Sequence, residues 1–209
     1  MKRSWFYVLF LILSFLIYVI WQNEKQMQLE NLIGEKQEEN ERLNMKVFLL
    51  QDYFMLQYSY SGNSMINCTV HDESGKSFEL LDLLGSDYKI VVYFSQKHCD
   101  SCIKRIVEGL NSLMNKVSLN KILVIGEFEN KRNFHAFKKG HDLNFPMYLI
   151  NEQNNPNSVL IDENLPFICI LNNEMTIKDL FIPIKELPDY MMEYYRTIIE
   201  KYHLNQIGD

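Results

Sequence analysis

The sequence predicts an α/β domain with a mixed sheet and helices on both faces, and three observations lead to this fold class. From about residue 63 onward, apolar runs of strand length alternate with segments that carry apolar residues at helical spacing. Near the end, two apolar runs follow one another across a short polar connection, which is typical of an antiparallel pair. The chain then closes with an amphipathic helical segment. Alternation followed by an antiparallel pair describes a sheet that contains both parallel and antiparallel strands.

The expected elements follow in order along this domain. The run KIVVYFS at 89–95 is apolar almost throughout, which is typical of a central strand buried on both faces. The next segment has apolar residues at helical spacing from Ile103 to Val117, and Asn130 is a suitable N-cap for the helix after it. The expected strands are 65–72, 89–95, 121–129, 145–151, 166–172 and 176–183. The expected helices and helical turns are 79–87, 102–117, 130–143, 157–162 and 187–204.

The composition is that of a globular protein rather than a disordered one. Of 209 residues, 47% are hydrophobic and 23% are charged, so one domain of ordinary size can bury a core. The net charge of -6 and the lack of a basic stripe argue against a nucleic-acid partner. Four cysteines are too few and too unevenly placed for a small disulfide scaffold.

Residues 1–22 are predicted to form a transmembrane anchor. The run from Trp5 to Trp21 has no charged residue, and roughly 20 apolar residues span a bilayer as a helix. The two tryptophans stand where interfacial aromatic residues lie. A cleaved signal peptide is the alternative, but its apolar core is shorter and ends in small residues, which are missing around Trp21.

The flanking charges predict the orientation of this anchor. Lys2 and Arg3 precede the apolar run, so the positive-inside rule places the N-terminus in the cytoplasm. The predicted protein is therefore a single-pass protein of a bacterial inner membrane. Residues 5–21 are expected to contact the lipid bilayer, and the C-terminal domain is expected to be periplasmic or otherwise extracytoplasmic.

Residues 23–62 are predicted to form a helical stalk, which leaves 63–209 for the domain. Residues 22–60 contain no proline and a single glycine, Gly34, which is where a break would fall. The apolar residues that share one face of this helix are Leu43, Val47, Leu50 and Phe54. A coiled-coil dimer is disfavoured because Lys36 and Glu39 occupy positions that heptads need to be apolar. A solvated spacer whose last turns dock on the domain is expected instead.

The chemistry of the domain is predicted to reside in Cys99 and Cys102, within FSQKHCDSC. Cys99 falls at the junction between the 89–95 strand and the following helix, where unpaired N–H groups and the helix dipole favour a thiolate. Cys102 falls one turn further, from where it can reach back and resolve a mixed disulfide. A strand, a Cys-x-x-Cys and a helix in this order indicate a redox pair.

A cysteine pair at this spacing has three other readings. A structural zinc site needs a second pair of ligands, and Cys68 and Cys169 are isolated in the sequence. A permanent structural disulfide would close a very small loop and would constrain the unfolded chain little. Two inert buried thiols are the third reading, although exported cysteine pairs rarely stay inert. Cys68 and Cys169 are expected to be core residues, with a bridge between them as the alternative.

Three stretches together resemble a known family. KIVVYFSQKHCDSC, FPMYLIN and NLPFICILNNEMTIKDLF look like a thioredoxin-like domain of the membrane-anchored, exported redoxin type (TlpA/ResA-like), over about residues 65–203. The resemblance implies a thioredoxin-like mixed sheet with helices on both faces, preceded here by one transmembrane helix and a helical stalk. It also implies that Pro166 is a cis-proline facing the cysteine pair, and that Leu165 offers its backbone to an extended substrate. Pro146 is the competing proline, but it matches an earlier strand of the family.

The sequence departs from the family around the cysteines. His98 stands where the family often has tryptophan, Tyr93 where thioredoxins carry a buried acid, and Arg105 where related exported proteins carry a glutamate. The usual proton-handling carboxylate is therefore not visible, and His98 is the candidate acid/base, with a plain surface histidine as the alternative. Asp100 is expected to raise the pKa of Cys99 by charge repulsion, which favours a mild oxidant or a reductant.

The predicted function is a membrane-tethered thiol–disulfide oxidoreductase that acts on protein or small-molecule disulfides outside the cytoplasmic membrane. The Cys99–Cys102 disulfide is expected to be the redox group, with no other cofactor and no metal. The expected partners are a thiol or disulfide protein substrate and an upstream electron donor or acceptor.

Three alternative functions stay open at this point. A peroxiredoxin-like thiol peroxidase would need the proline and threonine that this group places before its cysteine, and FSQKHC has neither. A copper-handling module would use a wider Cys-x-x-x-Cys and a distant histidine. His135 or His141 could be that histidine, but the cysteine spacing argues against this function. The third alternative is a non-catalytic binding domain, against which the intact cysteine pair argues.

Overall fold

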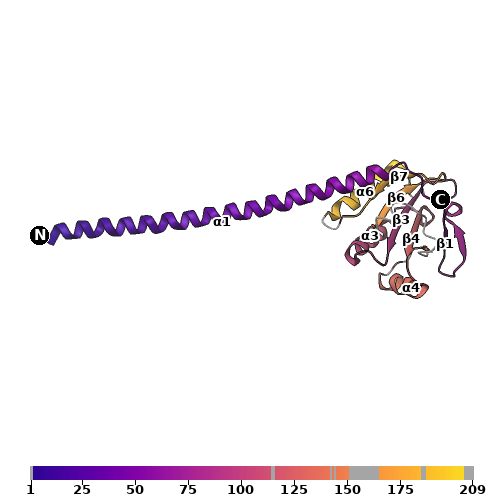
Figure 1. Cartoon of the computed structure of the whole chain (residues 1–209), viewed down its shortest axis with the longest axis horizontal. Helices are drawn as coiled ribbons and strands as arrows, with labels where there is room; N and C mark the ends of the chain where they lie inside the picture. Colours follow the sequence, from indigo (N-terminus) through magenta and orange to yellow (C-terminus); the bar gives the residue numbers. More distant parts are fainter. Residues whose placement is uncertain are drawn as a thin grey trace. The chain divides into compact units, whose positions relative to one another are not determined.

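The computed structural model describes residues 2–113, 116–141, 143, 145–150, 165–184 and 187–204, without the side chains of residues 2–4, 6, 8, 9, 188 and 189. The chain divides into two compact units, Met1–Gln51 and Asp52–Asp209 (Figure 1). The helical turn expected at 157–162 lies outside the described residues.

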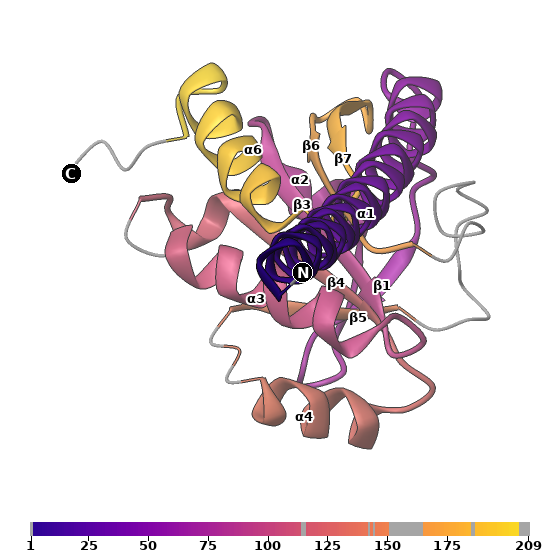
Figure 2. The same cartoon turned by 90° about the vertical axis from the view of Figure 1, so that its left-hand side faces the viewer.

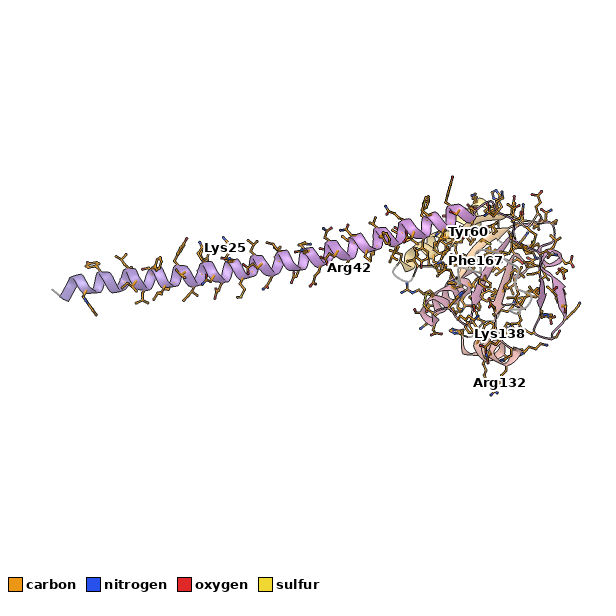
Figure 3. The ribbon with its side chains drawn as sticks, viewed as in Figure 1. Lys25, Arg42, Tyr60, Arg132, Lys138 and Phe167 are labelled. Atoms are coloured by element: carbon orange, nitrogen blue, oxygen red, sulfur yellow. A yellow bond between two sulfur atoms is a disulfide. The ribbon has the colours of Figure 1, made fainter. Side chains whose placement is uncertain are left out.

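Helix α1, Lys2–Tyr60, is continuous, so the break expected near Gly34 is not present. Gly34 is solvent-exposed, and a single glycine among good helix formers lowers the stability of a helix by only about 1 kcal/mol. Lys25 and Arg42 mark its course through the first unit (Figure 3). Among the described residues, no helical segment is long and apolar enough to cross a bilayer. The division of this unit into anchor and stalk stays a prediction.

The last turns of α1 dock on the domain, as expected, but through a different set of side chains. Tyr53, Leu56 and Tyr60 are half-buried and pack against the core of the second unit. They are spaced by three and four residues, so they share one face of the helix. Phe54 lies on a neighbouring face and is 64% exposed, so the predicted apolar face is not the one that docks.

A seven-stranded mixed sheet forms the centre of the second unit, with strand order β2-β1-β5-β4-β3-β6-β7 (Figure 1). Its strands are β1 Thr69–His71, β2 Ser77–Glu79, β3 Lys89–Ser95, β4 Ile122–Glu127, β5 Met147–Ile150, β6 Phe167–Leu171 and β7 Ile177–Phe181. The central strands β3, β4 and β5 are parallel, and β6 runs antiparallel to β3. The predicted α/β class and the antiparallel pair near the end of the chain are both confirmed.

Side chains alternate across this sheet and fill a separate core on each face. Val92 and Phe94 face the helices α3 and α6, which lie side by side (Figure 2). Val91 and Tyr93 face the opposite core, which includes α2. The helices of this unit beyond α1 are α2 Leu80–Leu84, α3 Asp100–Leu113, α4 Lys131–Gly140 and α6 Pro188–Lys201.

Most predicted boundaries differ from the observed ones by a few residues. The strand expected at 65–72 is confined to β1, and the turn after it is followed by β2, which the sequence did not predict. Strand β2 is an edge strand of three residues, with one half-buried side chain between two exposed ones, so it is too short for its alternation to identify a strand. In α4 the predicted N-cap is confirmed, because Asn130 Oδ1 accepts a hydrogen bond from the Asn133 backbone N–H at 2.9 Å.

Candidate active site

The cysteine pair follows the central strand of the sheet. Strand β3 pairs with β4 on one side and β6 on the other, and all but its first residue are fully buried. The chain leaves the sheet after Ser95, turns through 96–99 and enters α3 at Asp100. The predicted strand, cysteine pair and helix order is therefore the observed one.

Cys99 and Cys102 are joined in a disulfide, with their Cα atoms 5.4 Å apart. Cys99 is exposed, whereas Cys102 is half-buried. An approaching substrate would therefore meet Cys99 first, and Cys102 lies behind it. This difference in exposure matches the attacking and resolving roles that the sequence predicts.

Cys99 is the N-cap residue of α3. Its carbonyl oxygen accepts the backbone N–H groups of Cys102 and Ile103, at 3.0 and 3.1 Å. The Cys102 N–H also points at Cys99 Sγ, 3.2 Å away, and Ser101 Oγ lies 3.2 Å from the same sulfur. The sulfur thus occupies the place of the side-chain oxygen in an ordinary N-cap. These donors and the helix dipole would stabilise a thiolate at Cys99 once the disulfide is reduced.

Asp100, the acidic neighbour of Cys99, contacts a histidine that the sequence did not predict to lie beside it. His141, at the end of α4, places Nε2 3.4 Å from Asp100 Oδ1. The Asp100 side chain is 86% exposed, and that of His141 is 18% exposed. When His141 is protonated, it offsets part of the negative charge beside Cys99. The sequence analysis considered His141 only as a copper ligand, because 41 residues separate it from Asp100 in the sequence.

His98 is buried rather than a plain surface histidine. Its Nδ1 accepts the Ser95 backbone N–H at 3.0 Å, and its own backbone N–H donates to the Ser95 carbonyl. Its ring also packs edge-on against Tyr93. With Nδ1 as an acceptor, the neutral His98 ring carries its proton on Nε2, which is therefore a hydrogen-bond donor. Its acid/base role stays a prediction.

Leu165 and Pro166 lie at the same end of the strands as the cysteine loop, because β6 begins beside the end of β3. They directly precede Phe167, which pairs with Tyr93 across the antiparallel strands β6 and β3. The Phe167 ring is buried in the domain and stacks on the Tyr93 ring; Figure 3 labels Phe167. The Leu165–Pro166 bond is trans, because no peptide bond in the described parts of the chain is cis. The expected cis geometry is therefore wrong for this structure. Trans is the intrinsically favoured form of an X–Pro bond, by about 0.5–1 kcal/mol.

A buried carboxylate, Glu127, lies where the sequence analysis found none. It ends β4, opposite Ser95 of β3, and is only 7% exposed. Tyr93 Oη donates a hydrogen bond to Glu127 Oε2, and Lys97 Nζ lies 4.0 Å from Oε1. Burial, reinforced by the hydrogen bond to Glu127 and its charge, raises the pKa of Tyr93 well above its usual range. Tyr93, which stands where thioredoxins carry a buried acid, therefore contacts an acid from the neighbouring strand.

The two remaining cysteines are core residues and are not bonded to each other. Burial, with a smaller effect from Glu79, raises the pKa of Cys68 to about 11. Burial raises the pKa of Cys169 to about 12. Both therefore stay protonated and unreactive near neutral pH. Among the described residues, no group of three histidine, cysteine or acidic side chains could hold a metal ion.

No protein-family model matches the sequence, and no curated protein matches it either. Solved structures do match. A proposed thiol:disulfide interchange protein DsbE from Chlorobium tepidum has 9% identity and a TM-score of 0.50, over 66% of this chain and 96% of that one. A thiol:disulfide interchange protein from Bacteroides sp. has 14% identity and a TM-score of 0.47, over 68% and 90%. The peroxidoxin BcpB from Mycobacterium tuberculosis has 11% identity and a TM-score of 0.45, over 66% and 97%.

At these identities the similarity concerns the fold alone. The mixed sheet, the helices on both of its faces and the likeness to DsbE together define a thioredoxin-like fold. The predicted thioredoxin-like mixed sheet is confirmed.

Proposed function

We propose that this protein is a thiol–disulfide oxidoreductase, tethered to a membrane and acting outside the cytoplasm. One observation carries the proposal: a disulfide at a helix N-terminus, with Cys99 exposed and Cys102 half-buried behind it. Few other uses of a cysteine pair need this asymmetry, because a structural bridge gains nothing from one exposed sulfur at an N-cap.

The reaction proceeds by two exchanges at sulfur. In the reduced protein, the Cys99 thiolate attacks one sulfur of a substrate disulfide, and the other substrate sulfur leaves as a thiolate that takes up a proton. Cys102 then loses its proton and attacks Cys99 Sγ. The Cys99–Cys102 bond forms, the mixed disulfide breaks, and the second substrate sulfur leaves. The substrate gains two electrons and two protons, and the protein returns to its disulfide form. A dithiol partner regenerates the reduced protein by the reverse steps.

The backbone of Leu165 and Pro166 is the proposed substrate-binding segment. It directly precedes β6, at the end of the sheet where the cysteine loop follows β3. An extended peptide can therefore lie along it with its sulfur near Cys99. The redox group is the disulfide itself, and the proposal invokes no other cofactor. The partners are a disulfide-bearing protein substrate and a dithiol electron donor.

The proposed tether is the apolar run 5–21, preceded by Lys2 and Arg3. The length of the run, its flanking tryptophans and the positive residues before it support a single-pass anchor with the N-terminus in the cytoplasm. The cysteine pair would then work in an extracytoplasmic compartment, where disulfides form and persist. Deletion of residues 1–22 should move the protein from the membrane fraction to the soluble fraction. Retention of the shortened chain in the membrane would contradict the tether.

Trapping of mixed disulfides tests the enzymatic proposal. Cys102→Ser in the full chain should accumulate disulfide-linked partners on Cys99, because the resolving thiol is missing. The matched control is the double variant Cys99→Ser/Cys102→Ser, which should trap nothing. A Cys102→Ser protein that traps no partner and is oxidised rapidly by peroxide at Cys99 would support a thiol peroxidase instead. Tight stoichiometric copper binding without exchange would support the copper-handling reading.

A further inference from the structure

The carboxylate next to Cys99 pairs with a histidine from another helix. Asp100, the first residue of α3, directly follows Cys99, and its side chain is 86% exposed. Its Oδ1 lies 3.4 Å from Nε2 of His141, the C-cap residue of α4. In the portion of the chain that the structure describes, His141 is the one ion-pair partner of Asp100. Helix α4 therefore adds a titratable group to the charges around the cysteine pair.

Packing against the core fixes the position of His141. Its backbone N–H donates to the Phe137 carbonyl at 3.0 Å, and its ring packs against the Phe137 ring, with the centroids 4.3 Å apart. The Phe137 ring in turn packs against Phe94 of β3, the strand that leads into the cysteine loop. The His141 side chain is only 18% exposed, whereas the Asp100 carboxylate lies in solvent. The ion pair therefore restrains Asp100 rather than His141.

The other charged groups around His141 come from its own helix. Lys138 and Lys139 are in the last turn of α4, and Lys138 is paired with Glu73 from the turn between β1 and β2. The acid that faces His141 from α3 is Asp100. A protonated histidine at this place also faces the negative end of the α4 dipole. Because a histidine changes its charge between about pH 5 and 8, the pair is nearly neutral at the acidic end of this range and negative at the alkaline end.

The charge of this pair bears directly on Cys99, because Asp100 is the next residue in the chain. The N-terminus of α3 and the Cys102 N–H favour a thiolate at Cys99. An unpaired carboxylate beside the sulfur opposes the thiolate by repulsion of like charges. Pairing the carboxylate with a cation removes part of that repulsion.

We propose that His141 is a positioning residue for Cys99, which holds the Asp100 carboxylate in an ion pair and so lets the Cys99 thiolate form at mildly acidic pH. This inference rests on the proposed oxidoreductase function, because it concerns the thiolate that begins the exchange. As the pH falls, His141 takes up a proton from solvent and neutralises Asp100. The Cys99 thiol releases its own proton to solvent, and the two exchange steps at sulfur proceed as before. Cys99 thus stays reactive over a wider pH range than it would without His141.

The test follows the alkylation of Cys99 as a function of pH. The reduced full chain is treated with iodoacetamide between about pH 4 and 10, and the Cys99 peptide is quantified by mass spectrometry. In His141→Gln, the midpoint of the profile should lie higher by about 0.5–1 pH unit, because Asp100 keeps its full charge, and the alkaline plateau should not change. His141→Lys carries a cation throughout most of this range and should leave the midpoint at or below the wild-type value.

The matched control is His135→Gln, which removes an exposed histidine from the same helix and should leave the midpoint unchanged. In an Asp100→Asn background, His141→Gln should shift the midpoint by less than half as much, because the carboxylate through which His141 acts is missing. If His141→Gln does not fold, His141→Asn replaces it, since asparagine is well tolerated at helix C-termini.

Three results would overturn the proposal. The first is a wild-type midpoint in the folded neutral variant of His141. The second is an equal shift with and without the Asp100 carboxylate, which would mean that His141 acts on the sulfur by itself. The third is a midpoint in His141→Lys as high as in the neutral variant. A wild-type protein that forms no mixed disulfide with glutathione disulfide would instead refute the oxidoreductase function, whatever the midpoints are.

Discussion

The four cysteines should differ in reactivity by orders of magnitude once the disulfide is reduced. The perturbation is addition of iodoacetamide to the native, reduced protein at about pH 8. Only a thiolate is alkylated at an appreciable rate, so the rate scales with the ionised fraction. A thiol with the ordinary pKa of about 8.5 is roughly one quarter ionised at this pH.

The buried cysteines have far smaller ionised fractions. The pKa of Cys68, raised to about 11, leaves about one thiolate in a thousand at pH 8, and the pKa of Cys169, raised to about 12, leaves about one in ten thousand. Both side chains are also less than 10% exposed, which excludes the reagent. Cys99 is exposed and caps a helix with its sulfur near an N–H donor, so it should react at least a hundredfold faster than either.

Peptide mass spectrometry of samples quenched over time measures the four rates separately. Labelling of Cys68 and Cys169 should appear only when urea unfolds the domain, and should then approach that of Cys99. Labelling of either residue in the native protein at a rate within tenfold of Cys99 would refute the burial argument. A disulfide between Cys68 and Cys169 in the unreduced protein would refute it as well.

Three further outcomes follow from the packing. Burial raises the pKa of Tyr93 and Tyr195, as it does that of Cys68 and Cys169, so the native domain retains protons that the unfolded chain loses. Stability should be fully present below about pH 8 and fall as the pH rises above it, which urea titrations at increasing pH would reveal. Gly109→Ala should destabilise the domain by about 1–3 kcal/mol, because the new Cβ would lie 2.6 Å from the Tyr195 ring, and a neutral effect in chemical denaturation would contradict this contact. Asn130→Ala should lower the unfolding free energy by about 1 kcal/mol through loss of the α4 cap, whereas Asn130→Asp, which keeps the acceptor, should not.

Local signals in the sequence were sufficient for the central features of the fold. The apolar run 89–95 predicts a strand buried on both faces, and β3 has these bounds. Helical spacing after Cys102 and a capping residue at Asn130 predict α3 and α4, because capping and amphipathicity are properties of neighbouring residues. The position of Cys99 at a helix N-terminus follows from the same signals.

Features that depend on strand pairing could not be predicted in this way. Glu127 contacts Tyr93 across 34 residues, and only the register of β3 with β4 brings the two together. At the fixed distances from the cysteines where a carboxylate was expected, Tyr93 and Arg105 stand instead. A glutamate at the end of an otherwise apolar strand, at 127, was the available signal. The pairing of His141 with Asp100 is another long-range contact of this kind.

Because Cys99 is the N-cap residue of α3, the backbone amide of Cys102 can report on the chemistry at the cysteine pair. This single N–H donates to the Cys99 carbonyl and points at the Cys99 sulfur, so it senses both the helix end and the redox atom. In the proposed reaction, a mixed disulfide would direct that sulfur toward the substrate and leave the first turn of α3 with one acceptor fewer. The proposed cycle would therefore loosen and restore this helix terminus. The chemical shift and hydrogen-exchange rate of one backbone amide should then follow the proposed exchange without any added label.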